Sequence, residues 1–149
     1  MVKYFADLNS MDRTVFNQRC EKIFDSLDMN SFANKRIGTL SSGMKQKTSI
    51  ARTIIHNPDI IVFDEPTTGL DVMTSRSIIE LIRNSKEEKK TIIFSSHRME
   101  EVQSLADAIG VIYNGKLIFS GTKNDFESLE AEPKSYDDTL INLIDQSWT

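Results

Sequence analysis

The sequence has little of what marks secreted, membrane-spanning or nucleic-acid-binding proteins. Its one cysteine, Cys20, excludes an internal disulfide and fits a reducing compartment. No apolar run approaches the ~20 residues of a membrane span, and the N-terminus has no signal-peptide core. The formal net charge of −4 gives no general attraction to nucleic acid or to anionic lipid. We therefore expect an intracellular chain whose partners do not include nucleic acid.

What the sequence does contain is ordinary for a globular domain. Apolar residues make up 39% and charged residues 27% of the 149 positions, which argues against a disordered or fibrous chain. This length suffices for one domain with its own core. No internal repeat or low-complexity tract interrupts it. Function therefore has to be inferred from local patterns.

The pattern around which the chain is organised runs from Ile60 to Asp71. Its first four residues are apolar and predict a short buried strand, which ends by Pro66 because proline cannot donate to a sheet. Asp64 and Glu65 stand at the end of this strand. Carboxylates at the carboxyl end of a parallel strand can hold Mg²⁺ and activate a water molecule. The alternative is a strand that ends in an acidic turn without a function.

A second apolar strand, Thr91–Ser95, is followed by Ser96 and His97. The helical pattern of residues 74–85 lies between the two strands, and this order favours a parallel crossover. His97 is then expected at the same edge of the sheet as the two carboxylates. A lone histidine is usually structural, but its place at a strand end makes it a functional candidate.

The segment Leu40–Lys47 predicts the start of an amphipathic helix that ends near His56. Ser41, Ser42 and Gly43 are good N-cap residues, and the free amides behind them, flanked by lysines, can bind an anion. Without further context, a capped helix with basic surface residues is the better interpretation.

The other segments predict supporting elements. Asn9 and Ser10 can cap a helix over residues 11–28. Asn114-Gly115 is a strong hairpin signal, so the G-x-x-x-x-G-K spacing of residues 110–116 is rejected as a phosphate-binding loop. Further helical segments are expected at residues 31–37, 99–106, 123–129 and 139–146, with an acidic linker containing Pro133 at 130–138 and with Trp148 near the end.

Taken in order, these motifs resemble the later part of an ATP-binding cassette (ABC) ATPase domain. Residues 40–44 resemble the signature motif, and residues 60–65 resemble the Walker B strand with its trailing glutamate. Gly69-Leu70-Asp71 resembles the D-loop, and Ser95-Ser96-His97 resembles the segment of the switch histidine. The resemblance covers about residues 4–129. The residues after the signature and after His97 are similar to those of bacterial exporter cassettes of the sodium-efflux type.

The resemblance implies an α/β fold of the P-loop NTPase type. This fold has a mostly parallel sheet and a helical subdomain, and here it would be incomplete at the N-terminus. Residues 1–129 would form a partial ATPase domain, with the helical subdomain and signature in 1–45 and the later catalytic core in 46–129. Residues 130–149 would form an acidic linker and a C-terminal helix.

The resemblance also implies a catalytic centre for phosphoryl transfer from ATP. Asp64 would hold Mg²⁺ through water, and Glu65 would polarise the attacking water molecule. His97 would contact the γ-phosphate of ATP. The cofactors implied are therefore ATP and Mg²⁺.

The remaining motifs imply partners. Ser41 and Gly43 would meet the γ-phosphate of ATP bound by the opposite subunit of an ATPase dimer, and Asp71 would cross the same interface. A membrane permease subunit would complete the transporter. The chain would then work in the cytoplasm, at the inner face of the cell membrane.

Missing motifs limit this interpretation. The phosphate-binding loop, the adenine-stacking aromatic residue and the Q-loop glutamine, which come earlier in the family, are not identifiable. We therefore expect negligible ATPase activity from this chain alone and an unpaired edge on the strand at residues 60–64. The alternatives are a non-catalytic remnant or interaction module and, less consistent with the acidic charge, a soluble ABC protein of DNA repair or translation.

Overall fold

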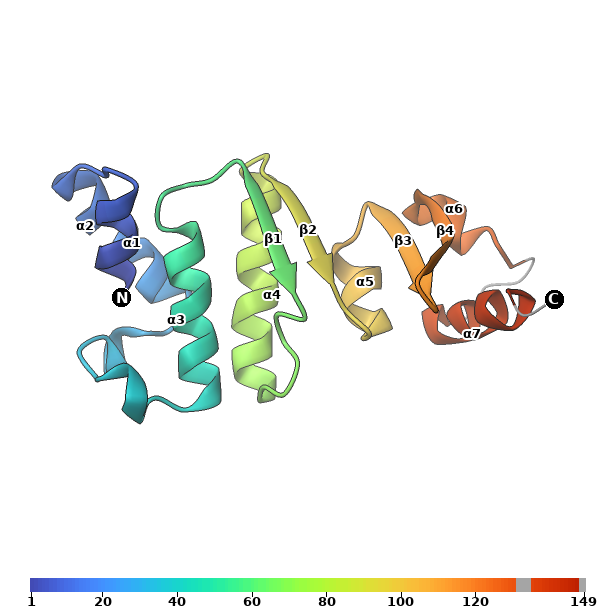
Figure 1. The fold of residues 1–149 in the computed structure, drawn as a ribbon, viewed down its shortest axis with the longest axis horizontal. Coiled ribbons are helices and arrows are strands. Elements are labelled where there is room, and N and C mark those ends of the chain that lie inside the picture. The colour runs from blue at the N-terminus through green and yellow to red at the C-terminus, as the bar shows by residue number, and fades with distance from the viewer. Residues whose placement is uncertain (131–134, 148–149) are drawn as a thin grey trace. The chain divides into compact units, whose positions relative to one another are not determined.

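The computed structural model describes residues 1–130 and 135–147. The chain divides into two compact units, Met1–Ser95 and Ser96–Thr149, and each is described by itself. Both units mix helices and strands, as expected for an α/β fold (Figure 1). Pro133 and Trp148 lie outside the described residues.

The first unit begins with helices and ends with a strand–helix–strand segment. Its elements, in order, are α1 (Val2–Leu8), α2 (Arg13–Ser26), the short 3-10 turns η1 (Asn30–Phe32) and η2 (Ile37–Thr39), α3 (Ser42–Ile54), β1 (Ile60–Asp64), α4 (Val72–Glu87) and β2 (Thr91–Ser95).

The N-terminal helices differ from the sequence-based prediction. Residues 2–8, which gave no clear signal, form α1, and the helix predicted from residue 11 begins at Arg13. Asp12 caps it, since its Oδ1 accepts a hydrogen bond from the Thr14 amide at 2.8 Å. Backbone hydrogen bonds of this kind lower the pKa of Asp12. The predicted cap at Asn9 and Ser10 is wrong because the preceding chain is already helical and Ser10 turns away with a φ of 54°.

The sheet of the first unit is parallel, as predicted. Residues 60–64 of β1 pair in register with residues 91–95 of β2, and α4 forms the crossover between them (Figure 1). Among the described residues β1 pairs with β2 alone, so its other edge is unpaired, as expected. The predicted burial of the strand is only half right. Ile61 and Phe63 are buried, but Val62 is 64% exposed because none of the described residues covers its face of the sheet.

Helix α4 buries Ile78, Leu81 and Ile82 and packs against β2. It is longer than the predicted 74–85, because it begins one residue after its cap Asp71 and continues to Glu87. The first two residues of the charged run 86–90 are therefore helical. Alongside α4, helix α3 runs in the same direction, and the starts of the two helices lie together (Figure 1).

The second unit is built around an antiparallel hairpin. Its elements are α5 (Met99–Leu105), β3 (Ala108–Tyr113), β4 (Lys116–Thr122), α6 (Lys123–Glu127) and α7 (Tyr136–Gln146).

The turn between β3 and β4 takes the predicted form, since Asn114 and Gly115 have φ of 47° and 76°. These left-handed values suit asparagine and glycine, and they confirm that this segment is a hairpin and not a phosphate-binding loop. Ile109, Phe126 and Tyr136 form the core of the unit. Helix α7 begins three residues earlier than predicted because Ser135 caps it, so the end of the predicted linker is helical.

Candidate functional site

The two predicted carboxylates lie at the carboxyl end of β1, opposite the end of β2. Asp64 is the register partner of Ser95. The Ser95 hydroxyl donates a hydrogen bond to Asp64 Oδ1 at 2.6 Å and accepts one from the Glu65 amide at 2.9 Å. Ser95 therefore contacts both residues, a contact that the sequence analysis missed. The signal available in the sequence was a serine at the end of the neighbouring strand.

Glu65 has an unusual backbone for a residue other than glycine, with a φ of 46°. Such a left-handed conformation is costly and persists only where the surrounding structure holds it. Besides the hydrogen bond to Ser95, two further contacts support this corner: the Thr68 hydroxyl donates to Glu65 Oε2, and the Gln46 side chain of α3 donates to the Pro66 carbonyl at 3.1 Å. The half-buried Glu65 carboxylate is thus fixed in orientation at the strand end.

The donor set at Asp64 fits Mg²⁺. Mg²⁺ prefers oxygen ligands and is usually held by one or two carboxylates, with substrate phosphates and water completing its shell. Asp64 is exposed and offers carboxylate oxygens. Across residues 1–130 and 135–147, no group of three or more His, Cys, Asp or Glu side chains is arranged to hold a metal ion by itself. Asp64 can therefore contribute one ligand to an ion that takes its other ligands from water or from a bound substrate.

His97 follows β2 by two residues and belongs to the second unit. Its neighbours are anchored to one buried carboxylate: the Ser96 hydroxyl donates to Glu101 at 3.0 Å, and Arg98 forms an ion pair with Glu101 at 2.8 Å. Glu101 is only 3% exposed, so these two contacts satisfy a carboxylate away from water. The predicted meeting of His97 with the carboxylates of β1 stays a prediction.

The predicted helix start at Ser41 is present. The Ser41 hydroxyl accepts a hydrogen bond from the Met44 amide at 3.3 Å, and α3 begins at the next residue. Ser41 and Ser42 are exposed, as expected for an anion-binding helix start, but Gly43 is buried. A Cβ at Gly43 would lie 3.3 Å from the Thr74 hydroxyl of α4, so glycine is what allows this close approach.

Asp71 caps α4, a role that the sequence analysis did not assign. Its Oδ1 accepts a hydrogen bond from the Thr74 amide at 3.0 Å, and its Oδ2 accepts one from the Thr74 hydroxyl at 2.8 Å. These bonds lower the pKa of Asp71. An aspartate three residues before a threonine at a helix start was the available signal. The predicted role of Asp71 at a subunit interface stays a prediction.

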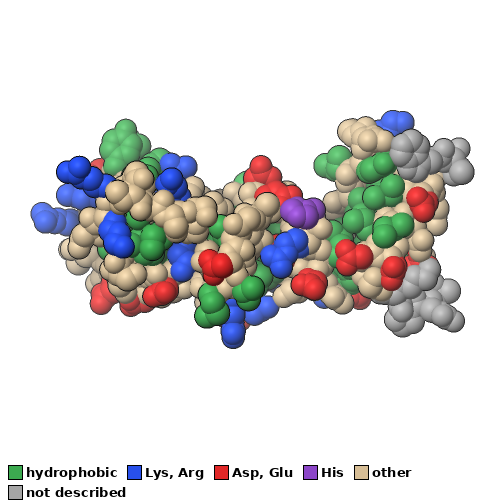
Figure 2. All heavy atoms as spheres, turned by 90° about the horizontal axis from the view of Figure 1, so that it is seen from below, with side chains coloured by type: hydrophobic (Ala, Val, Ile, Leu, Met, Phe, Trp, Pro, Cys, Tyr) green, Lys and Arg blue, Asp and Glu red, His purple; other side chains and the backbone are tan. Residues whose placement is uncertain are grey.

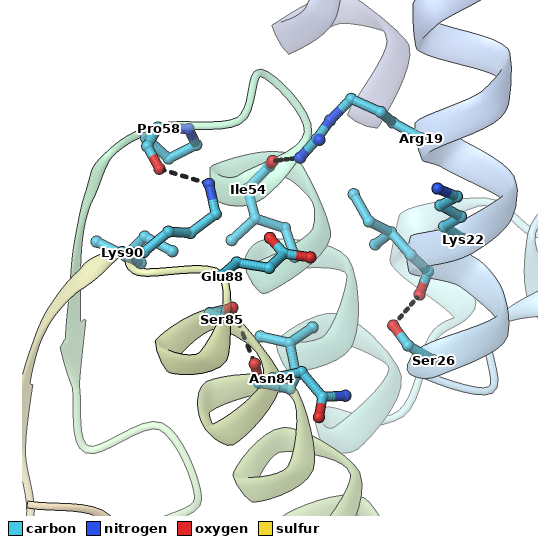
Figure 3. Close-up of a pocket in the computed structure, with 12 residues that line it drawn as sticks. Arg19, Lys22, Ser26, Ile54, Pro58, Asn84, Ser85, Glu88 and Lys90 are labelled. Atoms are coloured by element: carbon cyan, nitrogen blue, oxygen red, sulfur yellow. Dashed lines mark hydrogen bonds between the residues drawn. The ribbon is translucent and has the colours of Figure 1, made fainter.

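A cavity of about 200 Å³ lies at the other end of β1, beside the C-terminal ends of α3 and α4 (Figure 3). Two of its basic side chains, Arg19 and Lys90, donate hydrogen bonds to backbone carbonyls. Arg19 donates to the carbonyls of Ile54 and Ile55 at 3.0 and 2.8 Å, and Lys90 donates to the Pro58 carbonyl at 3.0 Å. Cations are favoured where helix carbonyls are exposed. We therefore regard this cavity as a packing site between helices.

The surface of the first unit carries charges of both signs. On the face shown in Figure 2, basic and acidic side chains are interspersed with apolar ones. Within the described ranges, no helix has the length and apolar character needed to cross a membrane.

Comparisons with known proteins agree with the predicted family. The family model described as "ABC transporter" matches residues 3–68. Over 136 residues the chain is 44% identical to the ABC transporter ATP-binding protein NatA of Bacillus subtilis. This match covers 91% of this chain and 55% of NatA. It is 35% identical over 126 residues to the linearmycin resistance ATP-binding protein LnrL of the same species, covering 85% of this chain and 39% of LnrL.

A solved structure described as the ATP-binding subunit of an ABC transporter has a similar fold. It superimposes with a TM-score of 0.87 at 21% identity and covers 96% of this chain and 60% of that chain. The chain spans about half the length of the curated relatives it matches, with 55% of NatA and 39% of LnrL covered.

Proposed function

Because the chain belongs to the ATP-binding cassette ATPase family, we propose that it provides the signature helix and the later catalytic motifs of an ATP-hydrolysing transporter subunit. The observation that carries this proposal is the pair of carboxylates at the end of β1. Asp64 and Glu65 follow a parallel strand at the edge where α/β sheets bind ligands, and Ser95 of β2 contacts both.

In the proposed reaction the two carboxylates have different tasks. Asp64 is exposed and would hold Mg²⁺ through water; when bound, this ion would neutralise charge on the phosphates. Glu65 is half-buried and oriented by Thr68, so its carboxylate would align and polarise the attacking water. His97 would contact the γ-phosphate. Positioning and electrostatic stabilisation account for most of the catalysis in such reactions.

The starts of α3 and α4, which lie together, would contact a second ATPase subunit. Ser41 and Gly43 at the start of α3 would meet the γ-phosphate of ATP bound by that subunit, with a hydroxyl and a backbone amide. Asp71, at the adjoining start of α4, would lie at the same dimer interface. The contact of Gly43 with Thr74 supports this grouping, because it keeps both helix starts in one place.

The whole protein would power a membrane permease from the cytoplasmic face of the membrane. We propose a bacterial exporter, because the residues after the signature and after His97 resemble those of exporter cassettes, and because the chain is similar to NatA and to LnrL, whose name includes linearmycin resistance. The permease would select the transported substrate.

The proposal is tested in a joined cassette, in which an N-terminal segment that carries a phosphate-binding loop of this family precedes residue 1 of this chain. We expect it to release phosphate from ATP at about 1 per second or faster, a rate common among enzymes. Glu65→Gln should reduce turnover at least about 100-fold, because a general base contributes that much. ATP binding should remain, since Glu65 acts on the water. The 149-residue chain alone should show negligible turnover.

Glu80→Gln is the matched control. This substitution makes the same chemical change away from the site, at a side chain of α4 that is 53% exposed. It should hydrolyse ATP like the parent cassette. Equal turnover in the Glu65→Gln variant and its parent would refute the catalytic role. If the folded joined cassette binds its partners but never releases phosphate, the chain is a non-catalytic interaction module instead.

A further inference from the structure

The Ser95 hydroxyl links the two catalytic candidates through one atom. The Glu65 amide can only donate, so Ser95 Oγ accepts its hydrogen bond at 2.9 Å. The single hydroxyl proton is then directed to Asp64 Oδ1 at 2.6 Å, a short distance for an O–H···O contact. Both interactions form across the parallel ladder, where Asp64 and Ser95 are register partners.

We propose that Ser95 is a positioning residue that fixes the Asp64 carboxylate and the Glu65 backbone relative to each other. The contacts exist in the chain by themselves, whereas their catalytic consequence rests on the proposed function. Ser95 would act through its two neighbours and would not touch the nucleotide.

The contact with Asp64 assigns the two carboxylate oxygens to different partners. Oδ1 accepts from Ser95, while Oδ2 makes no hydrogen bond within the described parts of the chain. Oδ2 is therefore the oxygen left for water in the shell of a bound Mg²⁺. Without Ser95, the exposed Asp64 carboxylate could rotate, and its two oxygens would no longer have separate partners.

The contact with Glu65 holds a costly backbone. Its φ of 46° is rare for residues other than glycine, and such conformations need support from neighbouring groups. The hydrogen bond that the Glu65 amide donates to the Ser95 hydroxyl supplies one such support from the adjacent strand. Because the direction of the Glu65 side chain depends on this backbone, the loss of the bond would misalign the carboxylate that polarises water.

The first experiment compares Ser95→Thr with Ser95→Val in the 149-residue chain. Threonine and valine have the same shape, and both suit a strand, but only threonine keeps the hydroxyl. The exposed position of Ser95 leaves space for the added methyl groups. Amide hydrogen exchange of Glu65 should become at least about tenfold faster in Ser95→Val, because its amide loses its acceptor. Ser95→Thr should keep the parent rate.

The second experiment uses the same variants in the joined cassette. Ser95→Val should lower kcat about tenfold or more, while the Kd for ATP stays within about twofold, since a mispositioned group affects the transition state more than binding. Ser95→Thr should restore the parent kcat. Glu65 exchange unchanged by valine would overturn the inference, as would a threonine variant as slow as valine. A joined cassette inactive with native residues refutes the proposed function, and the exchange experiment then still decides the role of Ser95.

Discussion

The two sheets of the molecule stabilise their strands in different ways. The hairpin β3–β4 is antiparallel, closes through a two-residue turn and packs on a core that includes Phe126, which is 1% exposed. The strands β1 and β2 are parallel and joined through α4, and one of their faces leaves Ile60, Val62 and Ile93 at least 57% exposed. Parallel sheets are normally covered on both faces. The parallel sheet that carries the candidate site therefore has one face that the described residues leave uncovered.

The largest expected effect contrasts the two faces of β1. Ile61→Ala should lower the free energy of unfolding of the first unit by about 2–5 kcal/mol, because Ile61 is 2% exposed and the change leaves a cavity. Val62→Ala should cost only about 0.5 kcal/mol, since Val62 is 64% exposed. Urea unfolding followed by amide resonances of β1 measures both losses.

The matched positions make the outcome decisive. The two residues are neighbours in one strand and differ chiefly in the face on which they lie. Losses of similar size would show that the exposed face is covered in solution, for example by a second copy of the chain. The contrast between the two sheets would then disappear.

Local sequence signals predicted much of the fold. The strand ends at Asp64 and Ser95, the cap at Ser41 and the turn at Asn114-Gly115 all depend on a few adjacent residues, and the structure has each of them. The side-chain links of the site were missed. Ser95 meets Asp64 across 31 positions of sequence, so only the strand register shows the contact.

Other misses have local causes. The cap of α2 was predicted at Asn9 and Ser10, whereas the structure uses Asp12. The exposure of Val62 could not be inferred from an apolar run, because such a run is typical of a strand covered on both faces. The burial of Glu101 could not be predicted from the sequence, since it depends on the hydrogen bond from Ser96 and the ion pair with Arg98.

An intermediate effect is expected in the second unit, at alkaline pH. The Tyr136 hydroxyl donates to Glu127 at 2.7 Å, and burial together with this acceptor raises the pKa of Tyr136 well above its ordinary value. Tyr136→Phe should lower the free energy of unfolding by about 1–2 kcal/mol at pH 7, because Glu127 loses its donor. Urea unfolding followed by resonances of α7 measures this loss.

The pH dependence of this variant follows from the direction of the shift. The neutral phenol is favoured in the folded state, so the unfolded state ionises first and stability falls as pH rises above about 10. The parent should lose its advantage over Tyr136→Phe in that range. A difference that stays constant from pH 7 to pH 11 would contradict the contact.

The smallest expected effect lies in the first unit, at acidic pH, and concerns the exposed cap Asp71. Its pKa is lowered by hydrogen bonds from the Thr74 amide and hydroxyl, so the folded state favours the ionised form. This contribution is present at neutral pH and disappears as pH falls below about 4, the ordinary aspartate pKa, and through the lowered value. Asp71→Ala should therefore unfold at a lower temperature than the parent at pH 7 but not near pH 2.

Asp71→Asn separates the charge of the cap from its geometry. Asparagine can still accept from the Thr74 amide, as a good N-cap residue does, but it does not titrate. The asparagine variant should therefore stay more stable than the alanine variant at both pH values. Calorimetric melting of the three proteins between pH 2 and pH 7 measures this order. If the deficit of Asp71→Ala were the same at both ends of that range, the carboxylate would not be the group that holds the start of α4.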